Sequence, residues 1–342
     1  MTDESASDSR RMPRGVATGI GSMPGLSVRT ALDIVTDVVP ELIFLPELPQ
    51  RGPGGEMVGR TFGLLNDVDV SLGSETQPSG WRFAGGDSAV MRRARSWLGE
   101  DIDALEECAA GREGWIKVQF AGPVTLAASG EFAYGERMIT DVQAVRDLGQ
   151  AVAAGVDSLL SQLRRRLPRA QWVVQIDEPW LGGALSGGVP TRSGLHTLKP
   201  LEEQLAADVL GKVAGAVSAA DAVSWIHTCE TQPPLELLSR LEFDLVSVDV
   251  SQIRDLASIE LLWEQQRLIG AGFAPAGVRE RETSVVDSRM MVMERFTRHF
   301  GITLGELLDH VVVTPSCGLA YSENATAELR QATNLVDAMR SG

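Results

Sequence analysis

Eight short apolar runs recur along the chain, and stretches long enough for helices separate them. We expect strands at 17–22, 42–47, 115–120, 173–177, 223–229, 245–250, 273–278 and 311–316. Most of these runs are continuous rather than alternating, which is typical of strands that are buried on both faces. Between them, segments 140–167 and 201–220 repeat apolar residues at the spacing of amphipathic helices.

The alternation of buried strands and helices favours parallel strands covered by helices, and eight repeats predict a closed (β/α)8 TIM barrel. A doubly wound open sheet is the alternative. It usually has fewer strands, and the glycines of GIGSMPG at 19–25 lack the spacing of a dinucleotide-binding loop. We expect one domain over 15–342 with a long insertion, 48–114, between the second and third strands. Residues 1–14 lack the apolar core of a signal peptide and are expected to form a disordered tail.

Polar residues end most of the predicted strands. Active sites of barrels collect at the carboxyl ends of the strands, so these side chains should converge on one mouth. They are Ser22, Glu47, Asp177, His227, Cys229, Asp249 and Cys317. The connections 48–114 and 182–200 are long, and we expect them to be either lids over this mouth or insertions tolerated at the surface.

Four of these strand-end residues form a candidate metal site. His227 and Cys229 lie two apart on one strand and therefore face the same side, and Asp249 and Cys317 end two further strands. Two thiolates, an imidazole and a carboxylate suit tetrahedral Zn²⁺ better than magnesium, calcium or iron. The alternative is that a few cysteines and histidines fall near strand ends by chance.

Composition excludes several classes of partner. The formal net charge of −15 disfavours nucleic acid and anionic membrane surfaces, which both require positive counter-charge. No apolar run is long enough to cross a bilayer. Three cysteines at distant positions argue against a disulfide framework and for a reducing compartment, so we expect a cytoplasmic protein.

With these motifs, the chain resembles the catalytic domain of cobalamin-independent methionine synthase, which belongs to the same barrel superfamily as uroporphyrinogen decarboxylase. The resemblance covers roughly residues 15–335 and rests on motifs in the same order: GIGSMP, LPE, AGPVT, QIDEP, IHTC, VSVDVS and PSCGL. It implies that His227, Cys229 and Cys317 are zinc ligands, with Asp249 where the family has a glutamate ligand. It also implies a substrate site for homocysteine at Ile20, Gly21 and Ser22, with Glu47 and Asp177 placed to meet an α-ammonium group.

The chain departs from this family at the positions that serve the methyl donor. Ser129 stands where the family has a tryptophan that stacks on folate, and Gly183 where it has a glutamate that contacts folate. Glu282 stands where the family has a proton-donating histidine. The resemblance therefore implies that the residues for zinc and thiol chemistry are retained, whereas those for the methyl donor are not. We expect methyltetrahydrofolate to bind poorly.

The resemblance implies a zinc-dependent methyltransferase that acts on the thiol of homocysteine or a similar small molecule. Asp177 and Glu282 are the expected catalytic residues, with Glu282 or Glu230 as an acid for the leaving group. The donor would be a methylated corrinoid protein or a small methyl donor. Two alternatives stay open: a zinc-dependent alkyl transferase or lyase acting on another thiol, and a non-catalytic barrel that binds a metal or an amino acid. A tetrapyrrole decarboxylase fits least, because it needs no His-x-Cys pair.

Overall fold

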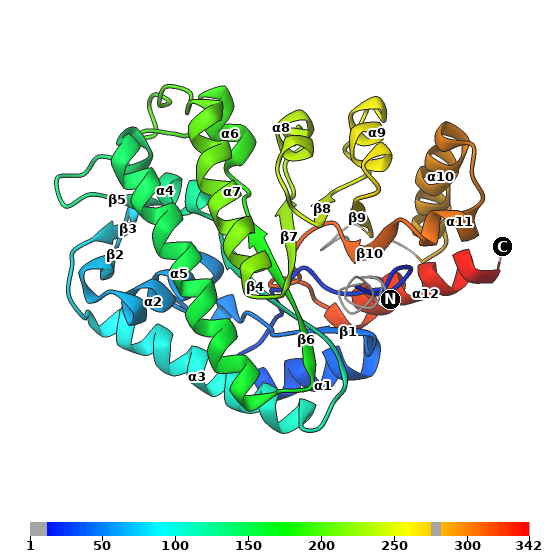
Figure 1. Ribbon diagram of the computed structural model, residues 1–342, viewed down its shortest axis with the longest axis horizontal. Coiled ribbons are helices and arrows are strands. Elements are labelled where there is room, and N and C mark those ends of the chain that lie inside the picture. The colour runs from blue at the N-terminus through cyan, green and yellow to red at the C-terminus, as the bar shows by residue number, and fades with distance from the viewer. Residues whose placement is uncertain (1–11, 275–281, 342) are drawn as a thin grey trace, which may run out of the picture.

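The computed structural model describes residues 12–274 and 282–341, and its centre is a curled sheet of seven parallel strands with helices outside it (Figure 1). The strand order is β1-β4-β6-β7-β8-β9-β10. The strands are β1 (Leu42–Phe44), β4 (Gly114–Ala121), β6 (Ala170–Asp177), β7 (Val223–Thr228), β8 (Leu245–Val248), β9 (Leu268–Ala274) and β10 (Val311–Pro315).

Six of the eight predicted strands are confirmed, with small shifts at their ends. The prediction at 273–278 is wrong by about five residues, because β9 begins at Leu268, and most of the predicted run lies outside the described residues. Glycines weaken the apolar pattern of β9, yet packing requires one of them. A Cβ atom on Gly270 would come within 2.5 Å of the Ser247 side chain on β8.

The predicted first strand, 17–22, does not form a regular strand. It makes two isolated parallel bridges instead, from Ala17 to Val313 on β10 and from Ser22 to Glu47 beyond β1. The segment therefore contacts both edges of the sheet. The fold is an α/β fold with a curled seven-stranded parallel sheet, consistent with a TIM-like barrel, but the described residues hold no eighth regular strand in that sheet.

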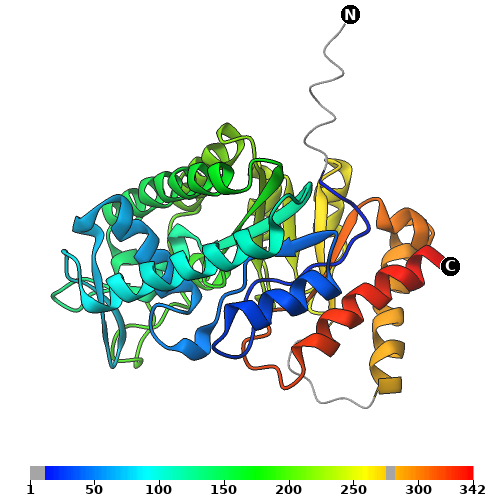
Figure 2. The ribbon, with the colours of Figure 1, turned by 90° about the horizontal axis from the view of Figure 1, so that it is seen from below.

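The two predicted amphipathic helices are confirmed as α5 (Val142–Arg166) and α7 (Glu203–Ala219). Asp141 caps α5 by accepting hydrogen bonds from the backbone of Gln143 and Ala144, and three arginines in the last turn complement the helix dipole. The other helices are α1 (Val28–Val38), α2 (Met57–Val68), α3 (Ala89–Ala109), α4 (Pro123–Ser129), α6 (Leu181–Ser186), α8 (Leu235–Arg240), α9 (Ala257–Glu264), α10 (Glu282–Phe300), α11 (Leu304–Leu308) and α12 (Ala325–Ser341). Figure 2 shows α1, α3 and α12 side by side in front of the strands.

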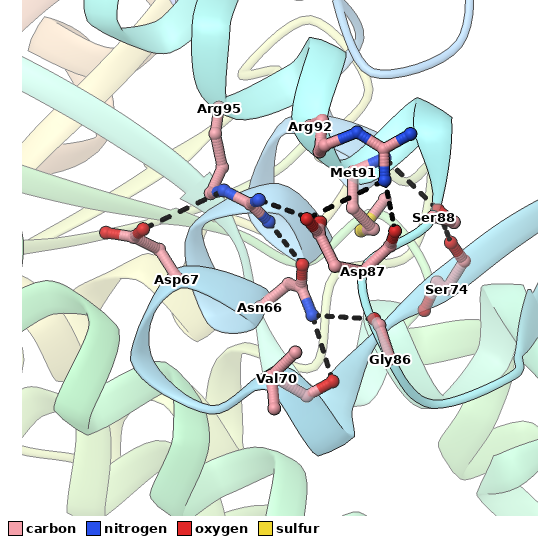
Figure 3. Close-up of polar contacts among 10 residues, drawn as sticks. All are labelled: Asn66, Asp67, Val70, Ser74, Gly86, Asp87, Ser88, Met91, Arg92 and Arg95. Carbon is pink, nitrogen blue, oxygen red and sulfur yellow. Dashed lines mark hydrogen bonds and ion pairs between the residues drawn. The ribbon is translucent and has the colours of Figure 1, made fainter.

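The insertion 48–114 is a folded unit rather than a loose loop. It contains α2, α3 and the antiparallel strands β2 (Ser74–Gln77) and β3 (Gly80–Phe83), and β5 (Gly130–Glu131) joins β3 to complete a small sheet. Polar contacts tie its parts together, as Figure 3 shows. Arg95 on α3 donates to Asn66 on α2 and, at 2.7 Å, to Asp87.

The interior of the curled sheet changes from apolar to polar along the strands, because alternate residues of each strand point inward. A buried apolar cluster fills one end. It contains Met12, Val16, Leu42, Val173, Val223, Trp225, Leu245, Leu268 and Val312. Further along β4, β6 and β7 lie Lys117, Gln175, Asp177 and His227, all buried. Met12 is thus part of the packed interior, and the polar end of the interior lies at the carboxyl ends of the strands.

No helix in the described ranges is both long and apolar enough to cross a membrane.

Candidate functional site

A cavity of about 350 Å³ lies at the carboxyl ends of the strands, within the size range of small-molecule sites. Eight of the ten predicted site residues line it: Ile20, Gly21, Ser22, Glu47, Asp177, His227, Cys229 and Cys317. Asp249 is not among its lining residues, and the side chain of Glu282 lies outside the described residues. The structure therefore brings together residues that lie nearly 300 positions apart in the sequence.

One wall of the cavity is the segment 20–22, which approaches its neighbours closely. A Cβ atom on Gly21 would come within 2.7 Å of the Gln119 side chain, so only glycine fits there. Likewise, a Cβ atom on Gly318 would come within 2.8 Å of Ser22 Oγ, and the Leu319 backbone donates to Ser22 O at 2.8 Å. The absence of a side chain at Gly318 lets the two backbone segments meet beside Cys317, and its absence at Gly21 leaves room for Gln119.

Two buried carboxyl groups face this cavity. Asp177 ends β6, and its Oδ1 accepts a hydrogen bond of 2.7 Å from Gln175 Nε2. Burial raises the pKa of Asp177 well above its usual value, and the nearby charge of Glu47 raises it further. Burial likewise raises the pKa of Glu47 to about 7, although the charges of Arg60 and Lys117 oppose the shift. In the described residues, Glu47 Oε1 is buried without a hydrogen-bond partner.

The opposite side of the cavity holds two thiols and an imidazole. The Sγ atoms of Cys229 and Cys317 lie 3.6 Å apart, one just after β7 and the other just after β10. His227 Nδ1 lies 3.0 Å from Ser247 Oγ, and its buried Nε2 has no hydrogen-bond partner in the described part of the chain. Interaction with the Cys229 thiol and the nearby His227 lowers the pKa of Cys317 to about 4, and interaction with Cys317, together with burial, raises the pKa of Cys229.

The donors of this thiol side fit zinc in chemistry and spacing. Across the described residues, no three or more His, Cys, Asp or Glu side chains are already arranged around a metal position. However, tetrahedral zinc bonded at about 2.3 Å to two sulfurs holds them about 3.8 Å apart, close to the observed 3.6 Å. The free Nε2 of His227, oriented through its other nitrogen, is the arrangement that metal-binding histidines use.

Asp249 is the predicted ligand that the structure does not bring to the cavity. Residue alternation along β8 would point it inward, but the strand ends at Val248 and a turn begins. Asp249 Oδ1 accepts hydrogen bonds from Ser251, at 3.0 Å from its backbone nitrogen and 2.6 Å from its hydroxyl. The carboxylate that the sequence pattern assigned to the site therefore forms local hydrogen bonds in a turn instead.

The predicted proton donors are placed as follows. Glu282 is the first residue of α10, and its side chain lies outside the described residues, as do residues 275–281 before it. Glu230 accepts hydrogen bonds from the backbones of Gly182 at 2.6 Å and Gly183 at 2.8 Å. Its carboxylate therefore caps the start of α6, and it does not line the cavity.

The two long connections differ in what they give the site. The insertion supplies lining residues that the sequence analysis missed: Pro49, Glu56, Met57 and Val58. Within the described chain, no residue of 182–200 lines the cavity, and His196 is exposed. The polar residues at alternate positions of WIKVQF and VVQID were also missed, although a lysine and two glutamines inside apolar strands were a signal.

The chain is similar to one protein family and to several solved structures. The family model described as "Cobalamin-independent synthase, Catalytic domain" matches residues 105–341. A B12-independent methionine synthase from Shewanella sp. W3-18-1, solved in complex with selenomethionine, is 11% identical with a TM-score of 0.55, over 96% of this chain and 97% of that chain. The tandem GH20 catalytic modules of a pneumococcal exo-β-D-N-acetylglucosaminidase are 8% identical with a TM-score of 0.47, over 95% and 83%.

No curated protein sequence matches the chain. At 11% identity, the likeness to the Shewanella structure supports the fold alone. The family model, by contrast, spans more than two-thirds of the chain and includes the cavity residues Asp177, His227, Cys229 and Cys317, which lie at or just after the ends of β6, β7 and β10. The chain therefore belongs to the cobalamin-independent synthase catalytic-domain family and is a methionine synthase-like methyltransferase.

Proposed function

We propose that this protein is a zinc-dependent enzyme that methylates the thiol of homocysteine to form methionine, with a methyl donor other than folate. The observation that carries the proposal is that two buried carboxyl groups and a pair of thiols share one cavity. One side matches the α-ammonium group of an amino acid, and the other matches the metal that would bind its sulfur. Selenomethionine, bound by the Shewanella protein, is an analogue of the expected product.

The carboxyl groups would recognise the amino-acid head. Glu47 and Asp177 are both buried, so their ionised forms lack water and gain most from a cationic partner. The unpartnered Glu47 Oε1 provides an acceptor for an ammonium hydrogen. A thiol without an amino group could not satisfy these acceptors, which makes them a basis for substrate specificity.

His227, Cys229 and Cys317 would hold the zinc ion. Three protein donors are the number that catalytic zinc sites use, and we leave Asp249 out of the set because its carboxylate bonds to Ser251. Zinc lowers the pKa of a bound thiol, so it would supply a substrate thiolate at neutral pH. Ser247 would fix the ring orientation of His227 through Nδ1.

The remaining residues would orient the substrate and limit water. Met57 and Val58 place apolar side chains against the cavity, from the start of α2. Glu282 stays a predicted acid for the leaving group.

We also propose that the segment containing Ala17 and Ser22 completes the sheet as an irregular eighth strand, because it bridges both edges.

The donor would be a methylated corrinoid protein or a small methyl compound. Ser129 and Gly183 offer neither an aromatic face nor a carboxylate.

A product assay with zinc-loaded protein tests the proposal. Homocysteine is offered with methylcobalamin, as a corrinoid donor, or with methyltetrahydrofolate, and methionine is measured by mass spectrometry. We expect methionine from methylcobalamin only, and none from a Cys317→Ser variant. Methionine from the folate would contradict the donor proposal. Alkylation of a thiol that lacks an amino group, without methionine from homocysteine, would replace the proposal with the alkyl-transferase alternative.

A further inference from the structure

Lys117 is a lysine enclosed inside the curled sheet. It lies on β4, its side chain is fully buried, and its Nζ lies 5.4 Å from the ring centres of both Phe44 and Trp225. Nζ donates hydrogen bonds to Ile20 O at 2.6 Å and to Gln175 Oε1 at 2.7 Å. Burying an ammonium group is costly, so its presence needs a reason other than the stability of the fold.

Gln175 extends this contact toward the cavity. Its Nε2 donates to Ile20 O at 2.8 Å and to Asp177 Oδ1 at 2.7 Å. Lys117 and Gln175 therefore both hold the carbonyl of Ile20, which begins the segment 20–22 in the cavity wall. Through Gln175, Lys117 is also linked to Asp177. Two separate elements of the cavity are thus fixed by one buried side chain.

The Gln175 amide is held in one direction by partners at both of its ends. Its oxygen accepts from Lys117, and its nitrogen donates to Ile20 O and to Asp177 Oδ1. Lys117 is therefore the donor that satisfies the amide oxygen and ties Gln175, and with it Asp177, to β4.

Lys117 also affects the charge of the two cavity carboxyls. Its positive charge lowers the pKa of both Glu47 and Asp177, against the raising effect of burial. It therefore favours their ionised forms, which are the forms that bind an ammonium group. Burial lowers the pKa of Lys117 itself to about 7, and the charges of Asp177 and Glu47 oppose that shift. When all three groups are ionised, the one cation and two carboxylates carry a net charge of −1, which one further positive charge would neutralise.

We propose that Lys117 is a positioning residue for the amino-acid head of the substrate, acting through Gln175 on Asp177 and through Ile20 on the segment 20–22. The proposal rests on the proposed function for the identity of the ligand. The bonding chain that carries it, from Lys117 through Gln175 to Asp177, is present without any ligand.

The first test needs no substrate. Lys117→Met removes the ammonium at similar length, and Thr314→Val is the matched control, since Thr314 Oγ1 is buried inside the same sheet without a partner in the described residues. Hydrogen exchange is measured at the amides of Met23 and Glu47, which bond between the segment after Ile20 and the loop after β1. We expect about tenfold faster exchange or more in Lys117→Met, and no change in Thr314→Val. Unchanged exchange in Lys117→Met would overturn the anchoring of Ile20.

The second test is a double-mutant cycle on homocysteine binding to the zinc-loaded protein. We expect Lys117→Met to weaken binding about tenfold, and the double variant with Asp177→Asn to bind no more than about twofold more weakly than Asp177→Asn alone. Additive losses would show that Lys117 does not act through Asp177. If Lys117→Met does not fold, Gln175→Met keeps the cation, removes the bridge and carries the same expectation. If wild-type protein does not bind homocysteine, the proposed function fails. The hydrogen-exchange test still shows whether Lys117 anchors Ile20 and the segment 20–22.

Discussion

The two sides of the cavity differ in how far they are held by the protein itself. The carboxylate side, formed by residues 20–22, Glu47 and Asp177, rests on buried hydrogen bonds from Lys117 and Gln175. Among the described residues, the side chains of the thiol side, His227, Cys229 and Cys317, have one hydrogen bond to an outside group, between His227 Nδ1 and Ser247 Oγ, and one contact between the two sulfurs. The carboxylate side is thus fixed before any ligand arrives.

This difference indicates that the two sides have separate roles in binding. A preformed carboxylate side costs little to reorganise and can select an amino acid by its head. The thiol side, whose donors bond mainly to one another, would be organised by a metal ion. The predictions below test each side separately, beginning with the largest expected effect.

The largest effect is expected from the thiols. Cys229→Ser or Cys317→Ser should lower zinc affinity on the order of a thousandfold, more than the tenfold to hundredfold typical of outer-shell changes, because a hydroxyl cannot supply a soft anionic donor. Metal analysis of the purified variants measures this. Cys108→Ser, at an exposed thiol on α3, is the control and should keep its zinc. Stoichiometric zinc in both site variants would contradict the assignment of the thiol side.

The carboxylate side should control affinity for the amino-acid head without affecting the metal. Asp177→Asn should weaken homocysteine binding by roughly 1.5–3 kcal/mol, the scale of a charge-assisted hydrogen bond. Calorimetry on the zinc-loaded protein measures it, with a simple thiol as the control ligand that should be indifferent. If zinc content also fell, the two sides would not be independent.

The buried carboxyl group of Glu47 should make the stability of the folded protein depend on pH. Its pKa is about 7 in the folded protein and 4.5 as a free group, so the folded state binds its proton more tightly than the unfolded chain does. That stabilisation is present below pH 4.5 and is lost as the pH rises through about 7. Glu47→Gln cannot ionise, so its free energy of unfolding relative to wild type should rise by on the order of 2 kcal/mol between pH 5 and pH 8. Denaturant unfolding measures the free energy of unfolding of wild type and Glu47→Gln at both pH values. If the two proteins differed by the same amount at pH 5 and pH 8, the buried, ionisable Glu47 would be contradicted.

The smallest effect is expected from the residue that orients His227. Ser247→Ala removes the hydrogen bond to Nδ1 and should lower zinc affinity about tenfold, the lower end of the range for outer-shell changes. Competition with a chelator measures the affinity, and Thr314→Val serves as a buried-hydroxyl control. No change would argue that His227 does not bind the metal through Nε2.

The sequence predicted most of the sheet because buried parallel strands read as continuous apolar runs. It misplaced β9, where Gly270 is required by Ser247 on the neighbouring strand, a contact that no local pattern reveals. It also did not anticipate that the first strand would form only isolated bridges. Tertiary packing decided both cases.

In the site, the structure brings to the cavity the predicted residues that lie at or near the end of a strand, and their chemical roles stay predictions. The placement of Asp249 failed because β8 ends one residue earlier and the carboxylate bonds to Ser251 in a turn. The wall formed by Met57 and Val58 could not be predicted, since it depends on how the insertion folds back over the sheet. Lys117 was visible in the sequence, but its partners Ile20 and Gln175 come from other strands and segments.

The central claim is that one ligand engages both sides of the cavity, by its sulfur and by its ammonium group. The most direct test is a titration of cobalt-substituted protein, followed by its visible spectrum, with homocysteine and with a thiol that lacks the amino-acid head. We predict that homocysteine changes the spectrum at a concentration at least about tenfold lower than the simple thiol, and that Asp177→Asn abolishes this advantage. Equal concentrations for the two thiols in the wild type, or an advantage that survives in Asp177→Asn, would contradict the account.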